Sequence, residues 1–358
     1  MNVKIEQLRG QNFRCFSALQ LEEFDHYNVI VGPNGAGKTS LLESIYVLGS
    51  GHSFRSNRRS LLCQHGYEKF ALSVSLRTDD GISRTVMRWQ AGKLEITRDQ
   101  QPVASIADLA QIMPVQAIGP WIHELISGGP EIRRRFLNWG LFHRHQDFYP
   151  CWRKYCRALH QRNAALQQNK GRIAAAWEPA LARLGEMIHA LRQDYVRQLQ
   201  CLLESDIISN LTDEPITLHY RPGWSVDRGL ARSLDESRHL HVTVHGPHRA
   251  ELLVLSGNQP ARGFVSRGQE RLIAMALGMA QALAHHAHAR NAGILLIDDL
   301  SSELDESRQN RVLTLLRHLP QQLFITDIHS QSVWERCPEP KKLFHCHDGT
   351  VSCSGPVH

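Results

Sequence analysis

Aliphatic runs and helical repeats alternate along the first third of the chain. Asn28 to Val31 form a short β-branched run, which predicts a buried strand. After the next loop, Leu41, Leu42 and Ile45 stand at helical spacing, and Gly49 is expected to end this helix. Further along, the segments FALSVSLRT and ISRTVMRWQ alternate polar and apolar residues, which predicts an antiparallel pair of strands.

The middle of the chain is helical in pattern, and the last part returns to strands. Helix-forming residues dominate from Gly128 to about Leu203, which predicts a helical lobe. Residues 204–262 break into short strand-like pieces separated by DEP, RPG and SGNQPARG. An aliphatic run from Ile294 to Ile297 then predicts a central strand. The pattern favours an α/β fold with an inserted, mainly helical lobe. We expect lobe I in residues 1–115 and 290–358, and lobe II in residues 116–289.

The loop after the first predicted strand, VGPNGAGKTS, has the spacing G-x-x-x-x-G-K-[ST]. Glycines let backbone amides curl around phosphates, and a helix that begins there directs its positive end toward them. Lys38 is expected to reach the β- and γ-phosphates of ATP, and the Thr39 hydroxyl to bind Mg²⁺. A glycine-rich turn without a ligand is the alternative, which the flanking strand and helix disfavour. The expected ATP-binding residues are Gly32, Pro33, Asn34, Gly35, Ala36, Gly37, Lys38, Thr39 and Ser40.

An acidic pair at the end of the later aliphatic strand is the best partner for this loop. Asp298 is expected to hold Mg²⁺ through water, and Asp299 to orient or deprotonate an attacking water. Lys38, Asp298 and Asp299 are therefore the candidate catalytic residues. A surface pair of aspartates that opens a turn is the alternative. A buried strand in a chain with a phosphate loop favours the catalytic interpretation.

A second candidate phosphate contact stands at the start of an apolar helix. Ser266 and Gln269 have the S-x-x-Q spacing of a helix capping box, which is a sufficient structural explanation for both residues. Gly268 also bares the backbone beside the helix N-terminus, where a phosphate could bind. Both interpretations stay open at this point.

Composition places the chain among ordinary globular proteins. Its 358 residues are 42% hydrophobic and 21% charged, and no run is long enough to span a membrane. The eight cysteines show no C-x-x-C spacing, so reduced thiols and a cytoplasmic location are expected. A formal net charge of +6 favours an acidic partner such as nucleic acid.

Two arginine clusters could neutralise DNA phosphates or could be solvated faces. The first contains Arg55, Arg58 and Arg59, and the second spans Arg133 to Arg135. One helix cannot point three consecutive side chains the same way. At least one arginine of the second cluster is therefore expected to serve packing or a dimer.

The order of the phosphate loop, SRGQ, LLIDD and SSELD resembles that of the ABC-type ATPase heads. In that resemblance, SRGQ stands at the signature motif and SSELD at the D-loop. It implies that Ser266, Arg267, Gly268 and Gln269 contact the γ-phosphate of ATP bound to a second subunit, in an ATP-dependent homodimer. The stretch between Lys38 and Asp298 is long, as in the SMC and Rad50 group, but too short for a long coiled coil.

Further stretches are similar to the RecF family of bacterial DNA replication and repair proteins: LRGQNFRCF, GHSFRS, GGPEIRRRFLNWGLF and GPHRAEL. This resemblance covers nearly the whole chain. It implies an ATP-gated clamp that binds DNA at gaps or at junctions of single and double strands. It also implies RecR and RecO as partners in loading a recombinase.

Two positions depart from the ABC pattern, and a third offers a further ligand. Asp299 replaces the usual glutamate and has a shorter reach, so slow hydrolysis suited to a switch is expected. Gln116 is expected as a third ligand for Mg²⁺, because it stands where the glutamine loop of the ABC heads would lie. The usual histidine position after the next strand holds Asp327, and His329 comes two residues later.

Two other functions share parts of this pattern. The ATPase subunit of a membrane transporter carries the same motifs, but the signature here lacks the usual paired glycines. A P-loop kinase acting on a small molecule would leave SRGQ and SSELD without a role. Both rank below the DNA clamp, and no membrane partner is expected.

Overall fold

A computed structural model describes residues 3–288, 292–300, 305–328 and 333–353 of the chain. The chain divides into two compact units. Unit 1 comprises Met1–Trp121 and His286–His358, and unit 2 comprises Ile122–His285. Among the described residues, no helix combines the length and the apolar character that crossing a bilayer requires.

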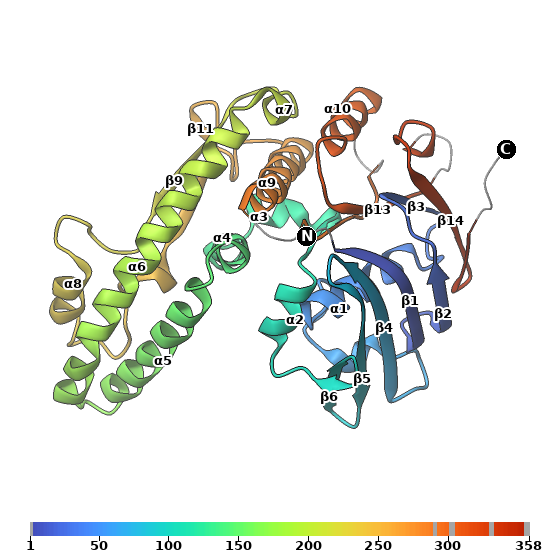
Figure 1. The fold of residues 1–358 in the computed structure, drawn as a ribbon. Helices are drawn as coiled ribbons and strands as arrows, with labels where there is room; N and C mark the ends of the chain where they lie inside the picture. The colour runs from blue at the N-terminus through green and yellow to red at the C-terminus, as the bar shows by residue number, and fades with distance from the viewer. Residues whose placement is uncertain (1–2, 289–291, 301–304, 329–332, 354–358) are drawn as a thin grey trace. The chain divides into compact units, whose positions relative to one another are not determined.

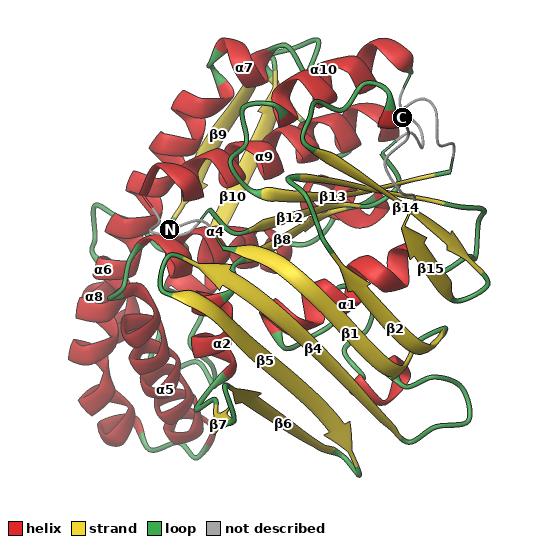
Figure 2. Ribbon diagram, turned by 45° about the vertical axis from the view of Figure 1, so that its right-hand side comes forward, coloured by secondary structure: helices red, strands yellow, loops and turns green. Residues whose placement is uncertain are grey.

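An antiparallel sheet forms one layer of unit 1, with its strands side by side in the order β2-β1-β4-β5-β6-β7 (Figure 2). The predicted strand pair is confirmed: it is β4 and β5, which pair antiparallel along their whole length. The bounds are β1 (Lys4–Phe13), β2 (Phe16–Glu22), β4 (Lys69–Thr78), β5 (Gly81–Gln90), β6 (Lys93–Arg98) and β7 (Gln101–Pro102).

A second, mainly parallel sheet of unit 1 has the order β15-β14-β3-β13-β12-β8. β3, β13 and β12 are buried along their whole length, as their aliphatic sequences require for strands covered on both faces. Its bounds are β3 (Tyr27–Val31), β8 (Val115–Ile118), β12 (Ile294–Ile297), β13 (Gln322–Asp327), β14 (Lys341–His347) and β15 (Thr350–Cys353). Shorter helical elements complete the unit: η1 (Arg59–Leu62), α2 (Ile106–Ile112) and α10 (Glu306–Leu316), while η2 (Pro120–His123) crosses its boundary.

Helix α1 (Lys38–Ser50) packs against β8 and β13 of the parallel sheet and against β1 and β4 of the antiparallel sheet. Leu41, Leu42 and Ile45 are buried in the shared core. The prediction that Gly49 ends this helix is wrong, because the C-cap is Gly51, at φ 72°. Gly49 lies inside the helix, where an added Cβ would stand 2.6 Å from a methyl carbon of Val115. It permits close packing of α1 on β8.

Unit 2 is mainly helical, and its helices α5 and α6 pack side by side (Figure 1). A small antiparallel sheet in the order β11-β10-β9 accompanies them. The helices are α3 (Glu124–Ser127), α4 (Pro130–Arg144), α5 (Phe148–Gln167), α6 (Gly171–Leu203), α7 (Asp206–Ser209), α8 (Leu230–Glu236), η3 (Pro247–Arg249) and α9 (Arg267–His288), which continues into unit 1. The strands are β9 (Ile216–Arg221), β10 (Glu251–Ser256) and β11 (Gln259–Pro260).

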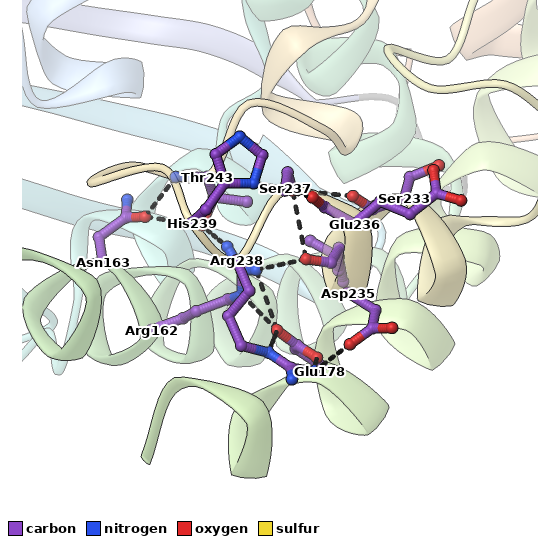
Figure 3. A network of polar contacts seen from close by, with 11 residues as sticks. Arg162, Asn163, Glu178, Ser233, Asp235, Glu236, Ser237, Arg238, His239 and Thr243 are labelled. Carbon is purple, nitrogen blue, oxygen red and sulfur yellow. Dashed lines mark hydrogen bonds and ion pairs between the residues drawn. The ribbon is translucent and has the colours of Figure 1, made fainter. Parts of the chain in front are cut away.

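A buried ionic network ties the β9–β10 connection to this helix pair (Figure 3). Arg162 of α5 is fully buried and donates hydrogen bonds to the Glu178 carboxylate of α6 at 2.9 and 3.2 Å. The same guanidinium reaches the Thr243 hydroxyl at 2.8 Å, and Arg238 bonds the second Glu178 oxygen at 2.6 Å. The inserted lobe therefore folds as a short helix pair, and the described residues contain no long coiled coil.

Candidate nucleotide-binding site

The glycine loop joins the end of β3 to the start of α1, as the sequence pattern predicts. Its backbone requires glycine at two positions at least. Gly32 has φ 156°, and an added Cβ would lie 2.1 Å from the carbonyl oxygen of Cys346. Gly37 has φ 112°, and an added Cβ would lie 2.7 Å from the sulfur of Cys15. The loop therefore keeps its backbone amides unshielded by side chains at these positions.

Lys38 is buried within the loop that precedes it. Its ammonium group donates hydrogen bonds to the carbonyl oxygens of Gly32 at 2.7 Å and Pro33 at 3.0 Å. These bonds hold the positive charge where the loop curves. An ammonium group has three donors, so it can bond phosphate oxygens without releasing every carbonyl.

Thr39 in the first turn of α1 contacts Asp298, which directly follows β12. The Thr39 hydroxyl lies 2.9 and 3.1 Å from the two carboxylate oxygens of Asp298. The parallel register explains the meeting, because β3 and β12 both flank β13 and end at the same edge of the sheet. The phosphate loop and the acidic strand, far apart in sequence, therefore form one site.

Asp298 is a buried carboxylate with two hydroxyl partners. Besides Thr39, the Thr326 hydroxyl of β13 donates to it at 2.7 Å. Burial raises the pKa of Asp298 above its ordinary value, and the neighbouring Asp299 charge adds to this shift. The hydrogen bonds from Thr326 and Thr39, and the charge of Arg55, act in the opposite direction. A cation at this position would relieve the cost of burying the charge.

Asp299 turns away from the strand direction. Its backbone has φ 56°, and its N–H donates to the Thr326 hydroxyl at 2.8 Å. Aspartate tolerates this left-handed conformation better than most residues. The turn places Asp299 beside Asp298 in the lining of the same cavity.

The cavity has a volume of about 320 Å³. This is within the usual range for small-molecule sites. Six residues of the glycine loop and the start of α1 line the cavity, together with Asp298 and Asp299. Its lining is Cys15, Asn34, Gly35, Gly37, Lys38, Thr39, Ser40, Arg55, Pro120, Asp298 and Asp299. A hydroxyl and a buried carboxylate side by side are hard oxygen donors, which suit Mg²⁺.

The sequence did not predict three of the residues that line the cavity: Cys15, Arg55 and Pro120. Buried Glu43 of α1 forms ion pairs with Arg14, at 2.6 Å, and with Arg55, at 3.8 Å. Arg55, for which the sequence left a DNA contact and a solvated face open, lines the nucleotide cavity. Cys15 and Arg55 belong to LRGQNFRCF and GHSFRS, so these stretches held the available signal.

Some expected residues lie elsewhere. Gln116 pairs with Leu295 in the middle of the strand ladder and does not line the cavity. Asp327 is buried at the end of β13, opposite Val31, and is likewise absent from the lining. His329 and residues 301–304 of the expected D-loop lie outside the described residues.

The expected signature residues begin α9 in unit 2. The capping box is confirmed, since the N–H of Ser266 donates to the Gln269 side chain at 2.9 Å and the N–H of Gln269 to the Ser266 hydroxyl at 3.3 Å. Ser266 and Arg267 are exposed. Among the described residues, apart from the helix backbone and the two chain neighbours, no heavy atom lies within 4 Å of a Cβ added to Gly268, so space is open beside this helix start.

The second arginine cluster divides between interior and surface. Arg133 is buried and forms a two-pronged ion pair with Glu251, at 2.8 and 2.9 Å. Arg134 is half-buried, and Arg135 is exposed. Arg133 therefore serves packing, as expected for at least one of the three.

Comparison with known proteins shows similarity along nearly the whole chain. The family described as "RecF/RecN/SMC N terminal domain" matches residues 4–352. A protein of Cellvibrio japonicus named "DNA replication and repair protein RecF" is 35% identical over 98% of this chain and 100% of its own length. A protein of the same name from Azotobacter vinelandii is 39% identical over 91% and 92% of the two chains.

Solved structures show the same fold. A structure described as the recombination mediator protein RecF with ATP in the RecFOR pathway has a TM-score of 0.85 and 24% identity, covering 99% of this chain and 98% of its own. The Smc head domain of Pyrococcus furiosus has a TM-score of 0.61 and 14% identity, with 98% and 96% coverage. The fold is that of an ABC-type P-loop ATPase head with an inserted, mainly helical lobe.

Proposed function

The chain belongs to the RecF family of the RecF/RecN/SMC group, and from this premise we propose that it binds and hydrolyses ATP as a DNA replication and repair protein. Hydrolysis serves as a release switch for an ATP-gated dimer on gapped or junction DNA. RecR and RecO are the proposed partners in loading a recombinase.

One observation carries the ATPase proposal: the Thr39 hydroxyl lies 2.9 Å from the Asp298 carboxylate in a cavity that Lys38 also lines. A structural turn would need neither a buried carboxylate nor a buried lysine at this point. Burying both charges is costly unless they act on a charged ligand. A triphosphate with a divalent cation supplies charges of both signs.

The residues of the loop bind and orient the triphosphate. Backbone amides from Gly32 to Ser40 and the N-terminus of α1 face the phosphates, and the Lys38 ammonium group bonds their oxygens. Thr39 and Asp298 would hold Mg²⁺, whereas Gln116, the third ligand expected from the sequence, does not line the cavity. Bound there, Mg²⁺ would neutralise phosphate charge during the transfer to water.

Asp299 is the proposed group that orients the attacking water. Its carboxylate lines the cavity beside Asp298, and the Thr326 hydroxyl fixes its backbone. Aspartate is one methylene shorter than glutamate, so its oxygens reach less far toward a water at the γ-phosphate. Slow hydrolysis follows from this geometry, and slow hydrolysis suits a switch that holds a state for many seconds.

The exposed start of α9 supports a shared site between two copies. Ser266, Arg267, Gly268 and Gln269 would contact the γ-phosphate held by the second subunit's loop. ATP would then join the two copies, and its hydrolysis would separate them. The positive net charge of the chain, +6, supports DNA as the ligand of the dimer.

Sedimentation of the Asp299→Asn protein on gapped DNA tests this proposal. This variant should bind ATP and hydrolyse it more slowly, so dimers should accumulate on DNA only when ATP is present. Lys38→Ala is the matched control, because it should lose ATP binding and remain monomeric. Monomers of Asp299→Asn that bind ATP but ignore it would overturn the shared-site mechanism.

A further inference from the structure

Two of the family-like stretches come together in unit 2. GGPEIRRRF begins α4, and GPHRAEL forms η3 and the start of β10. Arg133 and Glu251 form the ion pair between them, and Arg134 donates a hydrogen bond to the carbonyl of Ala250 at 2.8 Å. Arg134 thus lies beside the turn that carries Arg249, whose side chain is exposed.

A third arginine, Arg192 of α6, stands behind this turn. It is fully buried, and its guanidinium donates to the carbonyl of Pro247 at 2.7 Å and to the Asn138 side chain at 2.8 Å. The guanidinium also lies 5.3 Å from the centre of the Trp152 ring. These partners are neutral groups. Arg192 is therefore a buried positive charge without a carboxylate within 4.0 Å among the described residues.

The charges of the three arginines act on one imidazole. Burial lowers the pKa of His248 to about 4, and Arg249, Arg134 and Arg192 all contribute to this shift. Burial also lowers the pKa of Arg134, with Arg192 and Arg249 adding to the effect. His248 is neutral at pH 7, so the positive charge here comes from the arginines alone.

The nearby carboxylates do not cancel this charge. Glu131 and Glu251 act on Arg134 from a distance, but both oxygens of Glu251 already accept bonds from Arg133. In the described part of the chain, no carboxylate forms an ion pair with Arg134 or Arg249. Guanidinium groups whose charge no carboxylate neutralises, as at Arg134 and Arg249, are a site for an anion.

We propose that Arg134 and Arg249, with Arg192 behind them, bind a backbone phosphate of DNA on unit 2. The proposal rests on the DNA-binding function above and names the surface that performs part of it. Among the described residues, none of the large exposed apolar side chains belongs to α4, η3 or β10. Protein interfaces usually have an apolar centre, so a nucleic acid backbone fits this surface better than an acidic protein segment.

The test measures the affinity of the full chain for gapped duplex DNA, with ATP, over a series of salt concentrations. Arg249→Ala should reduce the slope of log affinity against log salt by about 0.9, the value for one lost phosphate contact. Affinity at 0.1 M salt should fall by roughly fivefold to tenfold. Arg172→Ala is the control, because Arg172 is exposed on the same unit outside the cluster, and its slope should match the unaltered chain.

The outcomes separate the two proposals. If the unaltered chain does not bind DNA, the proposed function fails. If it binds and Arg249→Ala has the same affinity and slope, the phosphate site is refuted and the function stands. Equal circular dichroism spectra and equal urea unfolding midpoints in all three proteins show that Arg249→Ala is folded. Binding of inorganic phosphate is measured as well. If Arg249→Ala loses phosphate binding but keeps its DNA affinity, the site is also refuted.

Discussion

The hydroxyl of Thr326 donates a 2.7 Å hydrogen bond to the carboxylate of Asp298. The hydroxyl oxygen of Thr326 also accepts a 2.8 Å hydrogen bond from the backbone N–H of Asp299. Thr326 is fully buried on β13, the strand between β3 and β12. One hydroxyl therefore orients both acidic residues of the proposed ATPase site.

Thr326→Val should slow ATP hydrolysis roughly 10- to 100-fold, because it removes two bonds at charged or strained groups while keeping the side-chain shape. ATP affinity should change little, since the glycine loop and Lys38 are untouched. Steady-state hydrolysis and nucleotide titration measure the two quantities. Thr326→Ser keeps the hydroxyl and should retain most of the rate. Equal rates for the Val variant and the unaltered chain would contradict the positioning role.

Asp298→Asn should stabilise the nucleotide-free protein near neutral pH. Burial raises the pKa of Asp298, so ionising it costs stability in the folded state. This cost develops as the pH rises from the ordinary pKa of aspartate through the raised pKa of Asp298. It has its full size at any higher pH. The advantage of Asn should therefore shrink as pH falls. Thermal midpoints without nucleotide or Mg²⁺, measured between pH 5 and 8, test this. A less stable Asn variant at pH 8 would contradict it.

Arg133→Ala should destabilise unit 2 by about 3 kcal/mol, since it leaves the partly buried Glu251 charge without its partner. The variant also removes donors to the carbonyls of Leu125, Ile126 and Gly128. Urea unfolding followed by circular dichroism measures the loss. Arg135→Ala, at the exposed position two residues on, should stay within about 0.5 kcal/mol of the unaltered chain. Similar losses of unfolding free energy in both variants would contradict a structural role for the ion pair of Arg133.

Glu178→Gln should destabilise the helix pair at pH 7, and the deficit should shrink in acid. Burial works to raise the pKa of Glu178, but hydrogen bonds from Arg238 and Arg162 outweigh it and leave this pKa below its ordinary value. A carboxylate whose pKa is lowered by folding stabilises the fold when the pH is above its pKa in the unfolded state. This contribution disappears as the pH falls through its pKa in the folded state. Guanidinium unfolding midpoints at pH 7 and pH 4 test the difference. A deficit that is constant with pH would contradict an ionic role for Glu178.

The structure of the nucleotide loop is largely determined by residues that are neighbours in the sequence. Lys38 and Thr39 were placed by spacing alone, because a strand, a glycine turn and a helix are determined by neighbouring residues. The end of the helix was not, since Gly49 is where α1 packs on β8 and Gly51 is the cap. Helix-ending and close packing both favour glycine, and only the neighbouring strand distinguishes them.

The arginine clusters show where local sequence fails. Three consecutive arginines in α4 have the same chemistry, yet Arg133 is buried against Glu251 and Arg135 is exposed. Arg55 resembled its surface neighbours but lines the nucleotide cavity beside Glu43. Which direction a side chain faces depends on what packs behind its backbone.

By itself, the sequence determined the phosphate loop, the acidic strand and the capping box, since each depends on residues close together in the chain, and it determined the family resemblance through the order of several such stretches. The tertiary structure alone decided that Thr326 joins Asp298 to Asp299, because this contact depends on the order of strands in the sheet. It also decided that Arg134, Arg192 and Arg249 share one region. Contacts between distant segments follow from packing, and no local spacing encodes them.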